Sequence, residues 1–340
     1  MIIRNEAELE EALSAPSEAD VEAAKNWDGD LLLLGVGGKM GPSLAQRAVK
    51  AAKLAGVPHR VIGVSRFTDE RSRALLEDAG VTTISANLLN EADLAALPNA
   101  PNVIYMAARK FGSTGDEGYT WAMNVYLPGR VAERYKASRI VAFSSGNVYP
   151  FVRVTSGGAT EDTPLEPVGE YAISALGRER MFTHFSKVNG TPVTLLRLNY
   201  AVEMRYGVLF DIGSKVFARE PVDVTMGNAN VIWQGDANSI CLRSLALASS
   251  PPLILNLTGP ETLSVRWVAR EFGRYFGVKP EFTGEEAPKA LLNNAALCFQ
   301  KFGYPAVSVT ELIESTARWI GSGGRTLGKP THFEARDGKF

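Results

Sequence analysis

The amino-acid sequence predicts an α/β protein in which a doubly wound parallel sheet is joined to a smaller mixed lobe. Two observations lead to this fold class. From residue 30 to about residue 200, short continuous apolar runs alternate with segments of helical pattern, which is typical of parallel strands covered by helices on both faces. A glycine-rich turn directly follows the first of these runs.

Each element follows from its local pattern. The run LLLL at 31–34 carries no charge and is too short for a stable helix, so it predicts a buried strand. The predicted strands of the sheet are 31–34, 60–64, 81–86, 103–107, 139–144 and 193–198, and the helices between them are 42–54, 70–79, 119–136 and 170–188. Beyond these elements the predicted helices are 207–219, 236–248, 265–276 and 309–320, with short strands at 222–225, 231–233 and 254–257.

This pattern divides the chain into an extension (1–29), a sheet domain (30–200), a substrate lobe interleaved with it (201–320) and a tail (321–340). Residues 1–30 hold nine acidic and two basic residues. They predict two short helices, 6–14 and 17–26, that are broken at Pro16. We expect a solvated extension lying on the main body, and the alternative is an arm that binds a partner.

Composition excludes several function classes. A net charge of −1 does not suit a nucleic-acid-binding protein. The three His and two Cys residues are scattered, so no metal site is expected. No apolar run approaches the ~20 residues that a membrane span needs, and no targeting signal is evident, so we expect a cytoplasmic protein.

The glycine turn reads Gly35-Val-Gly-Gly38-Lys39-Met40-Gly41, between a predicted strand and a predicted helix. Glycine permits a tight turn and close backbone approach, and a helix N-terminus offers free N–H groups to a phosphate. This context predicts a dinucleotide-binding (Rossmann) fold with the turn at the cofactor. Lys39 is a weaker candidate for a phosphate contact, and a turn without ligand is the alternative.

The end of the second strand bears on the choice of cofactor. An acidic residue there would bind the ribose of NAD, whereas an arginine accommodates the 2′-phosphate of NADP. The chain has Ser65 and Arg66 at this place, which favours NADP(H). Because Arg66 could instead face solvent and Asp69 and Glu70 are close by, NAD(H) stays possible.

Several ordered motifs together resemble the extended short-chain dehydrogenase/reductases, the NAD(P)-dependent epimerase/dehydratase group. The resemblance covers residues 30–320 and includes the glycine turn, YMAA at 105–108, SSGNVY at 144–149 and RLN at 197–199. It implies catalytic roles for Ser145 and Tyr171. It also implies further cofactor contacts, beside Tyr171, from Asn87, Leu88, Ala107, Ala108 and Asn124.

The resemblance fails at one important position. The family places a lysine four residues after the tyrosine, where it binds the nicotinamide ribose and assists proton transfer, but this chain has Ala175. A tyrosine without a neighbouring cation is about one part in a thousand ionised at pH 7. Arg178 lies about two helical turns after Tyr171 on the same face, so we expect it to supply the missing charge; the alternative is an arginine paired with Glu179 or Glu170.

The predicted substrate residues are Lys110, Ser145, Asn147, Asn199, Arg205 and Trp233. Arg205 could equally be a surface residue at a helix start, and Trp233 could be a core residue of a strand. Two functions stay open. One is an epimerase, dehydratase or reductase acting on a sugar-like hydroxyl or ketone. The other is a non-catalytic NAD(P)-binding sensor or scaffold, which Ala175 favours. The resemblance also implies a homodimer formed through the helices 119–136 and 170–188.

Overall fold

The computed structural model describes residues 2–110 and 115–338. Within these residues, a seven-stranded sheet has the order β12-β7-β5-β4-β1-β2-β3, and every neighbouring pair is parallel. Its strands are β1 (Leu31–Leu34), β2 (Val61–Ser65), β3 (Thr82–Ser85), β4 (Asn102–Tyr105), β5 (Arg139–Ser145), β7 (Val193–Leu198) and β12 (Leu253–Leu257). The predicted α/β fold class is confirmed.

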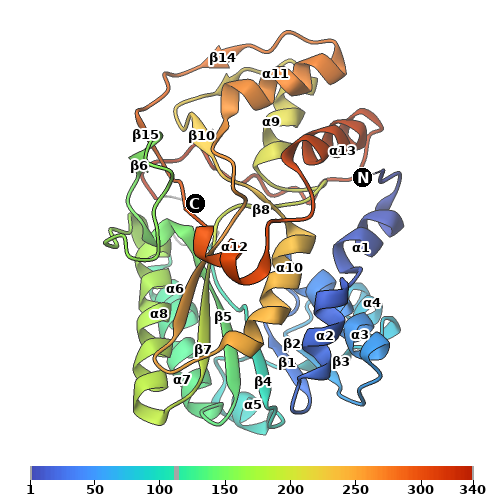
Figure 1. Cartoon of the computed structure of the whole chain (residues 1–340), viewed down its shortest axis with the longest axis vertical. Helices are drawn as coiled ribbons and strands as arrows, with labels where there is room; N and C mark the ends of the chain where they lie inside the picture. Colours follow the sequence, from blue (N-terminus) through green and yellow to red (C-terminus); the bar gives the residue numbers. More distant parts are fainter. Residues whose placement is uncertain (1, 111–114, 339–340) are drawn as a thin grey trace.

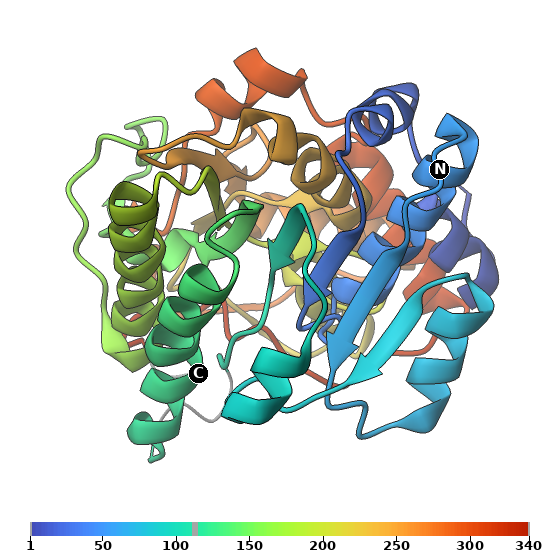
Figure 2. The ribbon, with the colours of Figure 1, turned by 90° about the horizontal axis from the view of Figure 1, so that it is seen from below.

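Helices cover both faces of this sheet (Figures 1 and 2). They are α3 (Gly41–Ala55), α4 (Glu70–Asp78), α5 (Glu91–Ala96), α6 (Glu117–Trp121), α7 (Leu127–Arg134), α8 (Gly169–Asn189), α10 (Gln234–Arg243) and α12 (Ala296–Phe302). The four leucines of β1 show why the strand is apolar throughout. Leu31 and Leu33 pack with α3 and α10, whereas Leu32 and Leu34 pack with α7 and α8 on the opposite face.

Two predicted elements differ from the structure. The predicted helix 119–136 is divided, because a π-helical turn (Ala122–Tyr126) separates α6 from α7. The strand at 254–257, predicted for the smaller lobe, is β12, and it pairs with β7 at the edge of the main sheet. Its apolar pattern identified a strand, but the pairing depends on where the preceding helices return the chain.

The smaller lobe lies above the sheet in Figure 1. Its helices are α9 (Val208–Phe217), α11 (Val265–Phe276) and α13 (Val309–Gly321), and its short strands are β8 (Ala201–Val202), β9 (Val222–Asp223), β10 (Asn228–Ala229), β11 (Ile232–Trp233), β13 (Leu263–Ser264) and β14 (Phe282–Thr283). A separate two-stranded sheet joins β6 (Val152–Arg153) to β15 (Lys289–Ala290). Phe272 and Leu312 lie in the apolar core that this lobe forms.

The N-terminal segment folds as α1 (Glu6–Ser14) and α2 (Glu18–Lys25), as predicted. It is not merely a solvated extension, because its inner face is part of both cores. Leu9 and Leu13 are fully buried in the core of the smaller lobe, and Ala24 and Trp27 pack into the core beside the sheet. The segment therefore has an apolar inner face, which its acidic composition does not indicate.

None of the helices in the described parts of the chain combines the length and the apolar character needed to span a membrane.

Candidate active site

A cavity of about 280 Å³ lies at the carboxyl ends of the central strands, where the smaller lobe meets the sheet. Ligands of open α/β sheets bind at this edge. The cavity is lined by residues at or just after the ends of β1, β4, β5 and β7, by Tyr171 and Arg178 of α8, and by Tyr206, Gly207, Val208 and Thr331. Of the predicted site residues, the cavity wall contains Gly38, Lys39, Met40, Ala108, Lys110, Ser145, Asn147, Tyr171, Arg178 and Asn199.

Of the three motif glycines of the turn, the fold requires two and the third is open to a ligand. Gly35 has φ +95°, and a Cβ there would lie 2.6 Å from the backbone nitrogen of Ala107. At Gly41 a Cβ would lie 2.1 Å from the carbonyl oxygen of Val36, so the fold itself requires both glycines. At Gly38 the nearest atom would be 3.4 Å away, and this residue is exposed at the cavity. Gly38 is therefore free to admit a ligand close to the backbone.

The N-terminus of α3 lies directly after this turn. Met40 occupies the N-cap position and makes no side-chain capping bond. A helix N-terminus without such a cap retains N–H groups for an anion. The turn and the helix can therefore accept a phosphate of a dinucleotide.

The predicted adenosine-side residues lie at the ends of β2 and β3. Ser65 is half-buried, and Arg66 is exposed and forms no ion pair within the described residues. Asn87 is exposed and its side-chain oxygen accepts a bond from the Leu89 N–H. The Leu88 side chain is buried in the apolar core.

Asn124 links the segment after β4 to helix α8. It is fully buried on the π-helical turn, and its side-chain oxygen accepts the Arg109 N–H at 2.8 Å. Its amide nitrogen donates to the Arg109 carbonyl at 2.8 Å and to Ser174 Oγ at 2.9 Å. Because these bonds use its polar atoms, Asn124 positions the segment after β4 against α8 and is not placed in the cavity wall.

Ser145, Asn147 and Tyr171 face the same cavity. Ser145 ends β5, and its Oγ donates to Asn147 Oδ1 at 3.1 Å while accepting the Asn147 N–H at 3.2 Å. Tyr171 stands in the first turn of α8 and is 9% exposed. The arrangement brings a hydroxyl, an amide and a phenol together at the sheet edge.

Ala175 and Arg178 have different surroundings on α8. Ala175 is fully buried in a small apolar cluster with Val148, Tyr149 and Ala159, away from the cavity wall. Arg178 lines the cavity although it is only 3% exposed, and its Nη1 donates to the Phe143 carbonyl at 2.9 Å. Its Nε and Nη2 are buried without a hydrogen-bond partner in the described structure.

The alternative partners of Arg178 are engaged elsewhere. Glu179 accepts two bonds from Arg197, at 2.9 and 2.8 Å, and one from Ser144 Oγ at 2.5 Å. Glu170 accepts a bond from Trp121 Nε1 at 2.7 Å. The alternative, in which Arg178 pairs with one of these carboxylates, does not hold in the described structure, and its guanidinium lines the same cavity as Tyr171.

Two lysines also line the cavity. Lys39 Nζ donates to the Ala201 carbonyl at 2.8 Å and lies 4.0 Å from the centre of the Tyr206 ring. Lys110 Nζ lies 5.8 Å from the centre of the Tyr171 ring. Burial lowers the pKa of Lys39 to about 7 and that of Lys110 to about 8.

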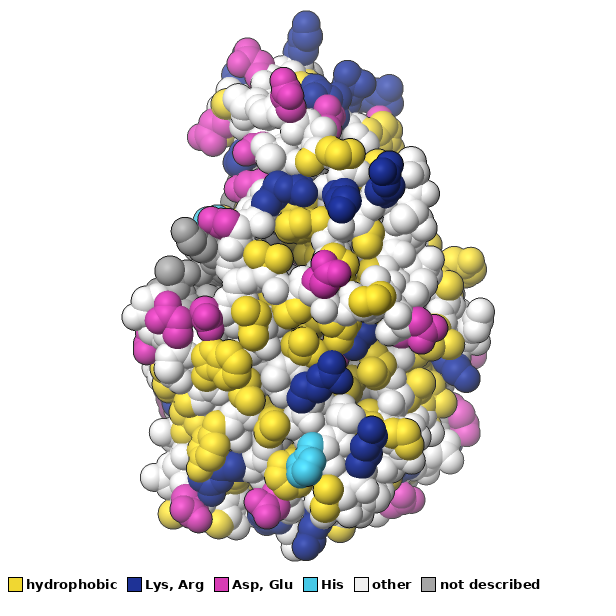
Figure 3. Space-filling model, turned by 90° about the vertical axis from the view of Figure 1, so that its left-hand side faces the viewer, with side chains coloured by type: hydrophobic (Ala, Val, Ile, Leu, Met, Phe, Trp, Pro, Cys, Tyr) yellow, Lys and Arg dark blue, Asp and Glu magenta, His cyan; other side chains and the backbone are white. Residues whose placement is uncertain are grey.

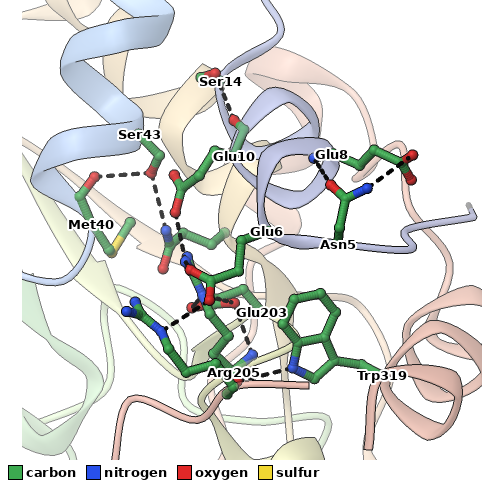
Figure 4. Close-up of polar contacts among 12 residues, drawn as sticks. Asn5, Glu6, Glu8, Glu10, Ser14, Met40, Ser43, Glu203, Arg205 and Trp319 are labelled. Atoms are coloured by element: carbon green, nitrogen blue, oxygen red, sulfur yellow. Dashed lines mark hydrogen bonds and ion pairs between the residues drawn. The ribbon is translucent and has the colours of Figure 1, made fainter. Parts of the chain in front are cut away.

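Two predicted substrate residues, Arg205 and Trp233, do not line this cavity. Arg205 is buried behind the wall, where Glu203 and Glu10 bind its guanidinium at 3.1 and 2.6 Å (Figure 4). Trp233 is 3% exposed and belongs to the core of the smaller lobe. The structure therefore does not bring either predicted residue to this cavity. Carboxylates of Glu10 and Glu203 bind the Arg205 side chain, and apolar residues surround Trp233.

With Arg205, the sequence also indicates Tyr206 as a residue that could meet an anionic substrate group, and the cavity wall contains Tyr206. Sequence reasoning missed Tyr200 and Thr331. Tyr200 has φ +48°, a strained conformation that often marks a functional segment. Tyr206 directly follows Arg205, and burial raises its pKa to about 12. Thr331 comes from the tail, where Asp211 Oδ2 accepts its N–H at 2.8 Å and its hydroxyl at 2.5 Å. A positive φ cannot be read from sequence, and the tail carries no motif.

Comparisons with known proteins agree with this architecture. Residues 31–202 match the model of the NAD dependent epimerase/dehydratase family. The chain is 25% identical over 253 residues to the uncharacterized UDP-glucose epimerase YtcB of Bacillus subtilis (strain 168), covering 69% of this chain and 78% of that protein.

Solved structures show the same fold at low sequence identity. UDP-glucose 4-epimerase of Thermotoga maritima, solved with UDP-glucose, is 15% identical and has a TM-score of 0.71, with 86% of this chain and 99% of that chain covered. UDP-glucuronic acid 4-epimerase of Bacillus cereus, solved with UDP-glucuronic acid and NAD, is 17% identical and also has a TM-score of 0.71, with the same coverage of 86% and 99%.

Proposed function

The chain belongs to the NAD dependent epimerase/dehydratase family, and we propose that it transfers a hydride at a hydroxyl or ketone of a sugar or sugar derivative. The observation that carries this proposal is the common cavity: Gly38 and Met40 of the phosphate-type turn line it together with Ser145 and Tyr171. A dinucleotide on the turn and a substrate oxygen beside the phenol would thus meet in one space.

The reaction divides among a few side chains. When bound, the dinucleotide accepts or supplies the hydride. Ser145 polarises the reacting oxygen through its hydroxyl, and Asn147, which is hydrogen-bonded to Ser145, orients that hydroxyl. Tyr171 donates or accepts the proton at the same oxygen.

Arg178 takes the part of the lysine that is absent at position 175. Its buried guanidinium lines the cavity with Tyr171, and two of its nitrogens have no protein partner in the described structure. A positive charge stabilises the phenolate that forms when the phenol gives up its proton. Unlike a lysine, the guanidinium does so without losing its own proton at neutral pH.

The cofactor is NAD(H) or NADP(H), and we propose a preference for NADP(H). This preference is supported by Arg66, which directly follows β2, is exposed, and forms no ion pair within the described residues. The Bacillus cereus structure contains NAD, so the two cofactors are compared directly below. UDP-sugars, on which similar proteins act, are the first substrates to test.

A homodimer through α6, the π-helical turn, α7 and α8, which correspond to the predicted helices 119–136 and 170–188, is part of the proposal. This face carries apolar side chains (Figure 3), among them Trp121, Tyr126 and Ile173, which are 40%, 56% and 38% exposed. Large exposed apolar residues on neighbouring helices are typical of association surfaces. A mass of one chain by light scattering at micromolar concentration would contradict the dimer.

The decisive experiment measures epimer formation and cofactor reduction with a panel of UDP-sugars, each with NAD or NADP. We expect Tyr171→Phe to abolish turnover while cofactor binding persists. Arg178→Met should lower kcat about a hundredfold and change the pH profile, and the double variant Ala175→Lys, Arg178→Met should recover part of the loss. Arg180→Met, an exposed neighbour on α8, is the matched control.

Two results would overturn the proposal. Turnover that survives Tyr171→Phe would remove the phenol from the mechanism. Tight dinucleotide binding without turnover of any sugar would favour the sensor or scaffold, for which Ala175 is the supporting feature.

A further inference from the structure

The tail runs from the smaller lobe to the start of α8 and forms part of the cavity wall. After α13, the Leu327 N–H donates to the Arg205 carbonyl at 3.1 Å. Thr331, which lines the cavity, donates its N–H and its hydroxyl to Asp211 of α9 at 2.8 and 2.5 Å. Phe333 is 4% exposed and belongs to the core of the smaller lobe. These contacts hold the tail on the smaller lobe as far as residue 333.

Beyond Phe333 the tail leaves this core and reaches α8. Arg336 Nη1 donates to the Lys289 carbonyl at 3.0 Å, and the guanidinium lies 4.4 Å from the centre of the Phe151 ring. Gly338 then packs against the first residue of α8, since a Cβ on Gly169 would lie 2.5 Å from the Gly338 carbonyl oxygen. The tail therefore connects the smaller lobe to the start of the helix that carries the proposed catalytic phenol.

A second, much smaller cavity adjoins the main one along this path. Asn147 and Tyr200 line both cavities, and Ala335 and Gly338 of the tail form part of the wall of the second. Its volume is about 20 Å³, which is room for about one water molecule. The tail thus restricts the free space on this side of Asn147 and Tyr200 to the size of a water molecule.

This side of the cavity matters for any group attached to the reacting sugar. In the proposed function the dinucleotide lies on the glycine turn, and the reacting oxygen lies beside Ser145 and Tyr171. Asn147, which is hydrogen-bonded to Ser145 at 3.1 Å, leads from that oxygen to the second cavity. A substituent that points away from the dinucleotide therefore meets the tail. The nucleotide of a UDP-sugar contains a pyrimidine, a ribose and two phosphates, so it needs far more room than one water molecule.

We propose that the tail sets the size of the substrate: with residues 331–338 in place, the cavity admits a compact sugar or sugar derivative and excludes one that carries a nucleotide. This inference rests on the proposed function and narrows its substrate class. The panel of UDP-sugars is therefore extended to free sugars and sugar acids. We expect kcat/KM for at least one compact sugar to exceed that for every UDP-sugar about tenfold or more.

The direct test measures the affinity of the full chain for UDP-glucose by calorimetry, with the dinucleotide present at saturation. The variant Arg336→Ala, Gly338→Val displaces the end of the tail, because a Cβ on Gly338 would lie 2.3 Å from the Val168 carbonyl oxygen. We expect this variant to bind UDP-glucose about tenfold tighter or more than the unchanged chain. Since Arg336→Ala removes a positive charge, attraction to the diphosphate cannot explain such a gain.

Two controls assign the gain to the tail. Lys329→Ala removes the same charge from an exposed part of the tail that is not among the described residues lining either cavity, and it should leave the affinity for UDP-glucose unchanged. Amide hydrogen exchange in residues 334–338 should become faster in the double variant, which shows that the segment has been released. The affinity for the dinucleotide should stay the same in both variants, because the glycine turn is not altered.

Three outcomes would refute the inference. UDP-glucose could bind the unchanged chain with a micromolar dissociation constant, which would show that the tail does not exclude it. The double variant could bind UDP-glucose no better than the unchanged chain, or its exchange in residues 334–338 could stay the same. These measurements report binding, so they are independent of the Tyr171→Phe test. Efficient turnover of UDP-sugars by the unchanged chain would refute only this inference, whereas no turnover of any sugar would refute the proposed function.

Discussion

Replacement of Asp20 by alanine tests whether the N-terminal helices are part of the fold. Asp20 lies on α2 and is fully buried, and its Oδ2 accepts from Arg47 Nε at 2.8 Å and Nη2 at 2.7 Å. Its Oδ1 accepts from Ser239 Oγ at 2.6 Å. The carboxylate thus joins α2 to α3, which starts at the glycine turn, and to α10, which contains Ser239.

The expected loss follows from the burial of Arg47, whose side chain is 7% exposed. Without Asp20 this guanidinium stays in the core with no opposing charge, and removing one partner of such a pair costs about 3–5 kcal/mol in the free energy of unfolding. Asp20→Ala together with Arg47→Met removes both charges, so the double variant should lose about 2 kcal/mol less than Asp20→Ala alone.

The assay is urea unfolding followed by far-ultraviolet circular dichroism and tryptophan fluorescence. Trp27, one of five tryptophans, is packed in the core beside the sheet, so the fluorescence signal includes the segment. Glu22→Ala on the exposed face of the same helix is the control and should not shift the midpoint. A loss below about 1 kcal/mol for Asp20→Ala would show that the N-terminal helices contribute little to the fold. No recovery in the double variant would show that the loss does not come from the unpaired charge of Arg47.

Three further predictions concern the site. A Cβ at Gly38 would have 3.4 Å of clearance within the protein, so Gly38→Ala should change stability by less than about 1 kcal/mol. It should still weaken dinucleotide binding, because the methyl group would occupy space that we assign to the ligand. Gly35→Ala should cost about 2 kcal/mol or more in thermal unfolding, because the φ of Gly35 is +95°. Affinity for the dinucleotide should be highest below pH 7 and fall as the pH rises past it, since Lys39 of the glycine turn, whose pKa burial lowers to about 7, then loses its proton; a pH-independent calorimetric affinity would contradict this. Arg66→Ala should weaken NADP about tenfold and leave NAD unchanged in fluorescence titrations, and an equal effect on both would remove Arg66 from cofactor choice.

Much of the fold was predictable because strands of a parallel sheet are apolar on both faces. The run Leu31–Leu34 shows this pattern and is followed by a turn whose glycines the packing itself requires at Gly35 and Gly41. Local pattern could not place β12 in the main sheet, because strand order depends on contacts between distant segments. It also could not show that Leu9 and Leu13 are buried, since the acidic residues around them predict solvent exposure.

The candidate site was predictable where its residues belong to motifs at strand ends, as do Ser145 and Asn147, or at a helix start, as does Tyr171. From sequence, Arg205 and Trp233 could not be separated from the residues that line the cavity, because arginine and tryptophan serve binding and packing alike. Only the positions of Glu10 and Glu203 reveal that Arg205 is already paired.

By itself the sequence determined the α/β class, the phosphate-type turn and the substitution of Ala175 for a lysine, because these depend on residue type and local periodicity. The tertiary structure decided which charged side chains lie around the same cavity. It brings Arg178 from the third turn of α8, Lys39 from the glycine turn and Lys110 from the segment after β4 to one cavity. Electrostatic interactions depend on distance and burial, and neither is encoded in sequence separation.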